Sequence, residues 1–383
     1  MGNELYRPSL VITLNESYVP FNENYVYGPS EFRKPFLRIY IHELLHFWQY
    51  LSQGYLTKLA LNEWKNLLNY EKSGDPTPPN DLIEQNEEFL KVNDITGFSI
   101  KELHEALCRF WDIHILGPVN MLEHHENLPW YQNKFDGNLI KRDIERMRRI
   151  VGGVEQYSSE SFDMLMQVED QYAGPYRWIL EKYHTTTCVI FFPLIGYFAM
   201  QSNYPVEFFE LAFDQLKYML PKKMNLKNVN IHNAWREFFP KIKYVCHVYN
   251  KSFSGCPLEP GWVIIKRSFG ADHPIFAHYL ALIERLQKKK IYKLGWDEYN
   301  VSKELEFWFA TPGDPISRLI LGLNFLPPTT LFHDGEWISD IQEVVKARGD
   351  GIAKVQDPFK LAEIAKDITE RFRKMKKEQL MKK

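Results

Sequence analysis

Apolar residues dominate one stretch of the chain, residues 35–54, and leave it only a narrow polar stripe. Pro35 suits the first turn of a helix, and Gly54 suits its C-terminal end. The apolar positions between them cover most of the helix circumference: Phe36, Leu37, Tyr40, Ile41, Leu44, Leu45, Phe47, Trp48 and Leu51. A helix that is apolar nearly all round is typical of a protein core. We therefore predict a buried helix here.

The polar positions of this helix recur every three or four residues. They are Arg38, His42, His46, Gln49 and Gln53. Side chains at these spacings project from the same face of a helix. Polar groups are costly to bury unless they are paired or bind a metal ion. The stripe therefore indicates a chemical role, such as orienting ligands or binding substrate.

Within the stripe, His42 and His46 belong to the pattern HExxH, with Glu43 beside the first histidine. Two imidazoles four residues apart can bind one Zn²⁺ ion at about 2.0–2.1 Å each. Glu43 is rotated away from the pair, to a position where it can take a proton from water. In these residues the chain resembles the zincin metallopeptidases, and the resemblance covers this helix closely. The alternative is a buried helix whose histidines only form hydrogen bonds with their neighbours.

A third metal ligand is expected on a second helix. Ser99 and Glu102 form a capping box, which predicts a helix that begins near residue 100 and ends before Gly117. Gluzincin-type zincins take a glutamate from a later helix as third ligand. Glu105-Ala106-Leu107-Cys108 is similar to the pattern around that glutamate, so the resemblance implies Glu105, with Asp112 as a hydrogen-bond acceptor for a ligand histidine. A solvated charged face is the other interpretation of Glu105. The rival ligands are His104, His124 and His125.

A second Glu-x-x-His pattern, from Glu181 to His184, gives a different possibility. Glu43 and His46 fit the same pattern, and two such helices with further glutamates form the di-iron site of ferritin-like bundles. In that case the protein would be a di-iron carboxylate oxidase. That arrangement gives His42 no role and needs a glutamate helix before the first pattern. A pair on a helix surface is the simpler interpretation of Glu181 and His184.

Helical periodicity dominates the remaining chain. The predicted helices cover residues 56–70, 138–150, 158–172, 175–201, 206–220, 233–248, 274–290 and 358–380. Residues 9–14 and 261–266 are rich in β-branched side chains and are predicted strands. The first is also the candidate edge to which a substrate backbone adds. The apolar run 187–200 is too short to span a bilayer, so we expect it in the core.

We therefore predict a mainly α fold with a small β component. Together with the resemblance, this implies an α+β, zincin-like fold with the HExxH helix packed in a helical core. Residues 1–135 are expected to form the metal-binding region, and residues 136–383 a mostly helical region. A single domain remains an open alternative.

Composition adds a few constraints. The chain has 383 residues and a formal net charge of −2, so its overall charge favours neither nucleic acid nor an anionic surface as partner. The four cysteines show no CxxC spacing, which favours free thiols in a reducing compartment, with two disulfide bonds as the alternative. The first residues lack a basic segment followed by an apolar one, so we expect no signal peptide. These features predict a cytoplasmic protein that acts without membrane or nucleic acid.

The preferred function is that of a zinc-dependent metallopeptidase. The resemblance implies that His42, His46 and Glu105 bind Zn²⁺. Glu43 would be the general base for a metal-activated water that cleaves a peptide bond in a peptide or protein substrate. A non-catalytic helical scaffold or binding protein is the remaining alternative. Substrate specificity and oligomeric state do not follow from the sequence.

Overall fold

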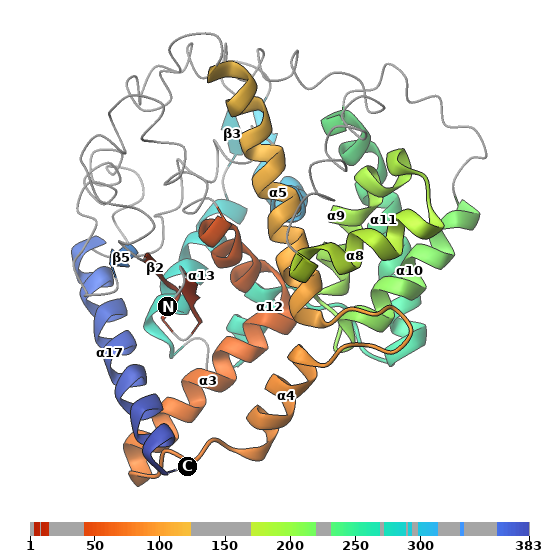
Figure 1. The fold of residues 1–383 in the computed structure, drawn as a ribbon. Coiled ribbons are helices and arrows are strands. Elements are labelled where there is room, and N and C mark those ends of the chain that lie inside the picture. Colours follow the sequence, from red (N-terminus) through yellow and green to blue (C-terminus); the bar gives the residue numbers. More distant parts are fainter. Residues whose placement is uncertain are drawn as a thin grey trace. The chain divides into compact units, whose positions relative to one another are not determined.

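The computed structural model describes residues 4–7, 9–14, 42–123, 170–219, 231–268, 272–288, 290–292, 298–312, 330–332 and 358–382. In these residues the fold is mainly helical with a few short strands, as the sequence predicts (Figure 1). The chain divides into two compact units. Unit 1 contains Met1–Glu88, Pro260–Lys288 and Leu319–Lys383, and unit 2 contains Phe89–Glu259 and Lys289–Arg318. The domain boundary expected at residue 135 lies outside the described residues.

Unit 1 contains a three-stranded sheet in the order β1-β2-β5. Strand β2 (Val11–Leu14) is antiparallel to β1 (Glu4–Tyr6) and parallel to β5 (Thr330–Phe332). The strand predicted at residues 9–14 is therefore confirmed. Its expected role as an edge for substrate is wrong, because both edges of β2 are already paired and strand addition needs a free edge.

The histidine-bearing helix of unit 1 is described from residue 42 to residue 52. It ends at Gln53, whose extended backbone forms an isolated bridge with Pro260. Gly54 does not act as a terminator here, because it is the first residue of the next helix, α3 (Gly54–Ser73). The apolar circumference is buried as expected, with Leu45, Phe47 and Leu51 almost fully enclosed. The beginning of the predicted helix, residues 35–41, lies outside the described residues.

The other helices of unit 1 are α4 (Asn80–Leu90), most of which belongs to this unit, α12 (Gly261–Arg267), α13 (Pro274–Gln287) and α17 (Pro358–Lys382). Helix α12 packs on α3 and α13, and α17 packs on α3, α13 and β2 (Figure 1). The predictions of helices at 56–70, 274–290 and 358–380 are confirmed with small changes at their ends.

The predicted strand at residues 261–266 is wrong, because these residues form helix α12. Ile264 and Ile265 are neighbours in sequence and are both buried, whereas a strand with one solvated face would bury only alternate residues. The first residue, Gly261, lies against the backbone of Leu51 and the side chain of Thr57. Tertiary packing therefore overrides the β-branched composition of this segment.

Unit 2 is built around helix α9 (Thr185–Ala199), in which residues 188–199 are all buried. Helices α5, α8, α10, α11 and α14 all contact it. Their bounds are Ile100–Glu123, Asp170–Lys182, Pro205–Met219, Ile231–Ser254 and Val301–Ala310, and a hairpin of β3 (Lys290–Tyr292) and β4 (Glu298–Asn300) completes the described part. The core position expected for residues 187–200 is confirmed, as are the helices predicted at 206–220 and 233–248.

Two predicted boundaries in this unit are wrong. The helix expected over residues 175–201 is two helices, since α8 ends at Lys182 and α9 begins at Thr185. Helix α5 does not end before Gly117 but continues to Glu123. The helix predicted at 138–150 lies outside the described residues, as does most of that at 158–172.

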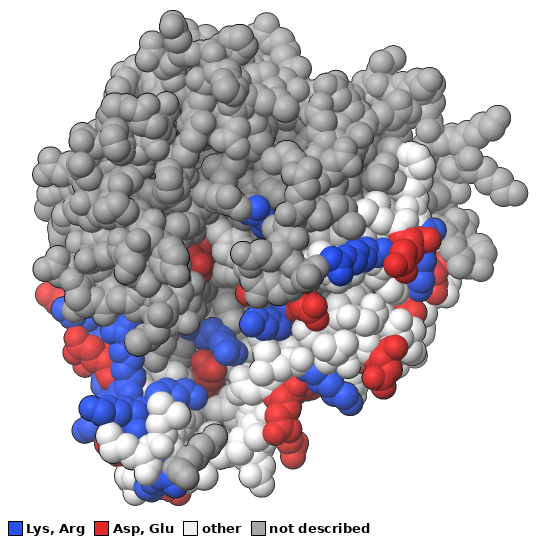
Figure 2. Space-filling view, viewed as in Figure 1, with Lys and Arg blue, Asp and Glu red and all other residues white. Residues whose placement is uncertain are grey.

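On the described part of the face in Figure 2, basic and acidic side chains are interspersed. Among the described residues, no helix is both long and apolar enough to cross a membrane. None of the four cysteines forms a disulfide bond; Cys108, Cys188 and Cys246 are buried and Cys256 is exposed.

Candidate metal centre

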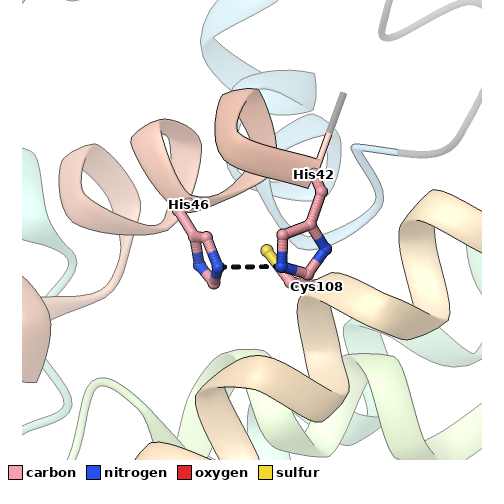
Figure 3. Close-up of side chains that lie close together, drawn as sticks. All are labelled: His42, His46 and Cys108. Carbon is pink, nitrogen blue, oxygen red and sulfur yellow. Dashed lines mark hydrogen bonds between the residues drawn. The ribbon is translucent and has the colours of Figure 1, made fainter. Parts of the chain in front are cut away.

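His42 and His46 lie one helical turn apart and their rings meet on one side of the helix (Figure 3). Their Nε2 atoms are 3.2 Å apart, and the rings are arranged edge to face with centroids separated by 4.7 Å. Two nitrogen ligands at about 2.0–2.1 Å from a tetrahedral metal are roughly 3.3–3.4 Å from each other. The two imidazoles are thus already close to the separation that a shared ion requires.

Gln49 fixes the orientation of His46. Its Oε1 atom lies 3.1 Å from Nδ1 of His46. A carboxamide oxygen can only accept a hydrogen bond, so Nδ1 carries the proton and Nε2 presents its lone pair toward His42. Metal-binding histidines commonly donate their second ring N–H in this manner. The polar stripe predicted from the sequence is therefore present, with His46, Gln49 and Gln53 all buried.

Glu43 is buried, with only 6% of its surface exposed. It follows His42 by one residue and is therefore rotated by about 100° around the helix axis. Phe47, four residues later and hence on the same face as Glu43, packs against Tyr279 of α13 with ring centroids 4.7 Å apart. Glu43 thus occupies a side of the helix that is enclosed by protein.

Helix α5 carries three further potential ligands, His104, Glu105 and Cys108. The capping box that begins this helix is confirmed: the backbone N–H of Ser99 donates to Oε2 of Glu102 at 2.7 Å, and the backbone N–H of Glu102 donates to Oγ of Ser99 at 3.2 Å. His104 and Cys108 are buried, and Glu105 is half-buried. Spacings of three and four residues place Cys108 on the same face as the other two.

Side chains of the kinds that bind metal ions, most of them buried, are thus present in both units: His42 and His46 in unit 1, and His104, Glu105 and Cys108 in unit 2. Imidazole, thiolate and carboxylate ligands fit a transition metal such as zinc. The two imidazoles of the HExxH helix are the pair whose mutual geometry lies within one unit.

Comparisons of the chain with protein-family models, with curated proteins and with solved structures found no match. The zincin resemblance therefore rests on the residues of the HExxH helix.

The structure brings together His42 and His46, as helical geometry predicts. Glu105 lies on α5 in unit 2, so its role as third ligand stays a prediction. Cys108 is a further potential ligand that the sequence analysis did not name, although it lies three residues after Glu105 on the same helix face. Arg38, His124 and His125 lie outside the described residues, and the side chain of Asp112 is not described.

The second Glu-x-x-His pattern lies at the surface. Glu181 and His184 are both exposed, and His184 follows the end of α8 at Lys182. A di-iron site needs both residues on one helix and turned into the core of a bundle. Their placement agrees with the simpler interpretation, a pair of surface side chains.

Proposed function

We propose that this protein is a zinc-dependent metallopeptidase, a hydrolase that cleaves peptide bonds. His42 and His46 hold the metal ion, and Glu43 is the general base. The observation that carries the proposal is the 3.2 Å separation of the two Nε2 atoms, together with the hydrogen bond from His46 to Gln49. A zinc ligand requires an imidazole whose tautomer is fixed so that Nε2 carries a lone pair and no proton.

Zinc, when bound at such a site, polarises the substrate carbonyl group and lowers the pKa of water. The role of His42 and His46 is to hold the ion on the helix that also carries Glu43. The carboxylate of Glu43 accepts a proton from the attacking water and then gives it to the amine that leaves, so it is regenerated in each cycle. Gln49 keeps the ring of His46 in place throughout.

The proposal is tested by replacing Glu43→Gln, which removes the proton acceptor and preserves the size of the side chain. We expect this variant to keep its zinc content and to lose about 10²–10⁴-fold in peptide hydrolysis. Zinc is measured by elemental analysis, and hydrolysis on a mixture of peptides whose products are identified by mass spectrometry. His46→Ala should lose both the metal and the activity.

The matched control is Glu87→Gln, which changes an exposed glutamate of α4 in the same manner. It should leave zinc content and hydrolysis unchanged. Full hydrolysis by Glu43→Gln would contradict the role of Glu43. A wild-type protein that binds no zinc, and whose stability His42→Ala barely changes, would indicate a scaffold in place of an enzyme.

A further inference from the structure

Helix α11 of unit 2 carries a stripe of exposed residues on the side that faces away from its neighbours. Its opposite side is buried, and the helix packs on α9 and α10 (Figure 1). Tyr244 and Val248, which are 69% and 45% exposed, lie at the centre of the stripe. Large apolar and aromatic side chains that lie one helical turn apart and open to solvent are typical of a surface that binds a partner.

The stripe extends on both sides of Tyr244 at helical spacings. Glu237 and Pro240 lie seven and four residues before Tyr244. Val248 and Lys251 lie four and seven residues after it. All of these residues are exposed, and they fall within about 40° of one line along the helix. The stripe is therefore symmetric about Tyr244, with an acidic residue at one end and a basic residue at the other.

We propose that this stripe is the interface of a homodimer, in which α11 packs antiparallel on α11 of a second copy of the chain. A two-fold axis through Tyr244 places each residue opposite the one at the same distance on the other side of Tyr244. Glu237 then faces Lys251 of the second copy, and Lys251 faces Glu237 of the second copy. The two tyrosines meet at the axis, and Pro240 contacts Val248 of the second copy on either side.

Charge complementarity favours a second copy as the partner. The two-fold symmetry repeats each contact, so this register forms two ion pairs and keeps the apolar residues together at the centre. A parallel arrangement in register would place Glu237 opposite Glu237 and Lys251 opposite Lys251, which is unfavourable. Glu237 already pairs with Lys241 at 3.4 Å, but both side chains are more than half exposed. Such a pair adds little stability, so the carboxylate can also bind a second lysine.

The basic residues that flank the stripe do not oppose this arrangement. Arg236 donates a hydrogen bond to Glu304 of α14 at 2.7 Å. Lys243 pairs with Glu306 of the same helix. Both positive charges are therefore compensated within unit 2, and they add little repulsion between two copies.

The length of the stripe determines how tight the dimer should be. From Glu237 to Lys251 it is about 21 Å long. One helix face from each copy buries less surface than the roughly 1,600 Å² of a standard stable complex. We therefore expect a weak dimer with a dissociation constant in the micromolar range.

Reversal of the two charges tests the proposal by sedimentation velocity on the full-length protein. We expect the wild type to change from monomer to dimer as its concentration rises. Glu237→Lys and Lys251→Glu each replace two attractive contacts by two repulsive ones, and each should raise the dissociation constant at least about 10-fold. The double variant restores both pairs with their signs exchanged, so its dissociation constant should return to within about threefold of the wild-type value.

The matched control is Lys101→Glu, which reverses an exposed charge of α5 in the same unit. It should leave the dissociation constant unchanged. Circular dichroism checks that each variant is folded, which we expect because all of these side chains are exposed.

Cross-linking through Tyr244→Cys tests the position of the axis. The two copies of residue 244 lie next to each other in the proposed dimer, so mild oxidation should join them by a disulfide bond. Non-reducing electrophoresis then shows a species of twice the mass of the chain. The exposed Cys256 is the internal control, since it lies beyond the end of α11. Its two copies would be roughly 30 Å apart, so the wild type should not be joined.

A wild type that stays monomeric at every concentration would overturn the proposal and leave the stripe to a partner of another kind. A dimer that the single charge reversals do not weaken, or that the double variant does not restore, would overturn this interface. A disulfide bond between two copies of Cys256 in the wild type would contradict the antiparallel register. These outcomes are independent of the proposed peptidase, whose residues lie in unit 1.

Discussion

His46 and His278 are both buried histidines, but their surroundings differ. His46 is paired through Nδ1 with Gln49 and through Nε2 with His42. For His278 of α13, 3% exposed, neither ring nitrogen has a hydrogen-bond partner among the described residues. Burial lowers the pKa of His278 from 6.5 to about 4, because the charged ring would lose its hydration. The effect of His278 on the free energy of unfolding therefore depends on pH, because burial disfavours the charged form of its ring.

We predict that His278 makes the protein less stable as the pH falls from about 6.5 to 4. In that range the unfolded chain binds a proton that the folded protein does not, so acid favours unfolding. The pKa difference, from 6.5 to about 4, corresponds to roughly 3 kcal/mol once the pH is below both values. His278→Leu should therefore raise the midpoint of thermal unfolding more at pH 5 than at pH 7.5.

The control is His184→Leu, because His184 is exposed. It should shift the midpoint little at either pH. Identical pH profiles of the wild type and His278→Leu would show that His278 is protonated equally in the folded and unfolded states.

The residues of the candidate site differ in how far the sequence alone determines their positions. His42, Glu43, His46 and Gln49 share a single helix, so their relative positions follow from helical geometry alone. A third ligand has to come from a part of the chain that is distant in sequence, and helical periodicity carries no information on such a contact. A buried cysteine such as Cys108 is in most proteins simply a small apolar residue, so it gives no signal of its own.

At the scale of elements, local interactions were predicted well and long-range packing was not. The capping box of α5 involves residues three apart, and both of its hydrogen bonds are formed. The segment 261–266 has the β-branched composition of a strand but forms α12, because it packs on α3 and α13. The end of α5 was also misplaced, since Gly117-Pro118 does not interrupt it.

We predict that Gly261→Ala destabilises unit 1 at the contact of α12 with the histidine-bearing helix. A Cβ atom at residue 261 would lie 2.5 Å from the carbonyl oxygen of Leu51 and also close to Oγ1 of Thr57. That hydroxyl already donates to the carbonyl oxygen of Tyr50 at 2.6 Å, so neither neighbour can move easily. We expect a loss of about 1–3 kcal/mol in the free energy of unfolding.

Urea denaturation followed by circular dichroism measures this loss. Asn69→Ala, at an exposed position of α3, is the control and should change the free energy of unfolding by less than about 0.5 kcal/mol. If Gly261→Ala has the same free energy of unfolding as the wild type, the backbone at Leu51 can move away from the added methyl group without destabilising the protein.

At the scale of the whole molecule, each unit is assembled from segments that are far apart in the sequence. Unit 1 combines the first 88 residues with Pro260–Lys288 and Leu319–Lys383. Helix α17, near the end of the chain, is attached to α3 by two hydrogen bonds from Arg371 to Glu71, at 2.6 and 2.8 Å. Changes in amino-acid composition along the chain, and loop-rich stretches, can mark a boundary between two contiguous regions. They do not reveal units such as these, each of which combines segments that are far apart in the sequence.

A bound metal should stabilise the whole molecule, because its ligands come together only in the folded chain. An ion that binds only the folded protein raises the free energy of unfolding by about 2.7 kcal/mol when its free concentration is 100 times the dissociation constant. We therefore expect Zn²⁺ to raise the midpoint of thermal unfolding of the metal-free protein, with the midpoint increasing as zinc is added.

The ligand variants make this prediction specific. His46→Ala removes one of the two paired imidazoles of the HExxH helix and should abolish the zinc-dependent rise. His184→Ala, at an exposed position, should keep the rise, and Mg²⁺ in place of Zn²⁺ should have little effect because Mg²⁺ prefers oxygen ligands to imidazole nitrogen. An equal rise in His46→Ala would place the stabilising ion elsewhere, since an ion at the His42–His46 pair could then not be its source.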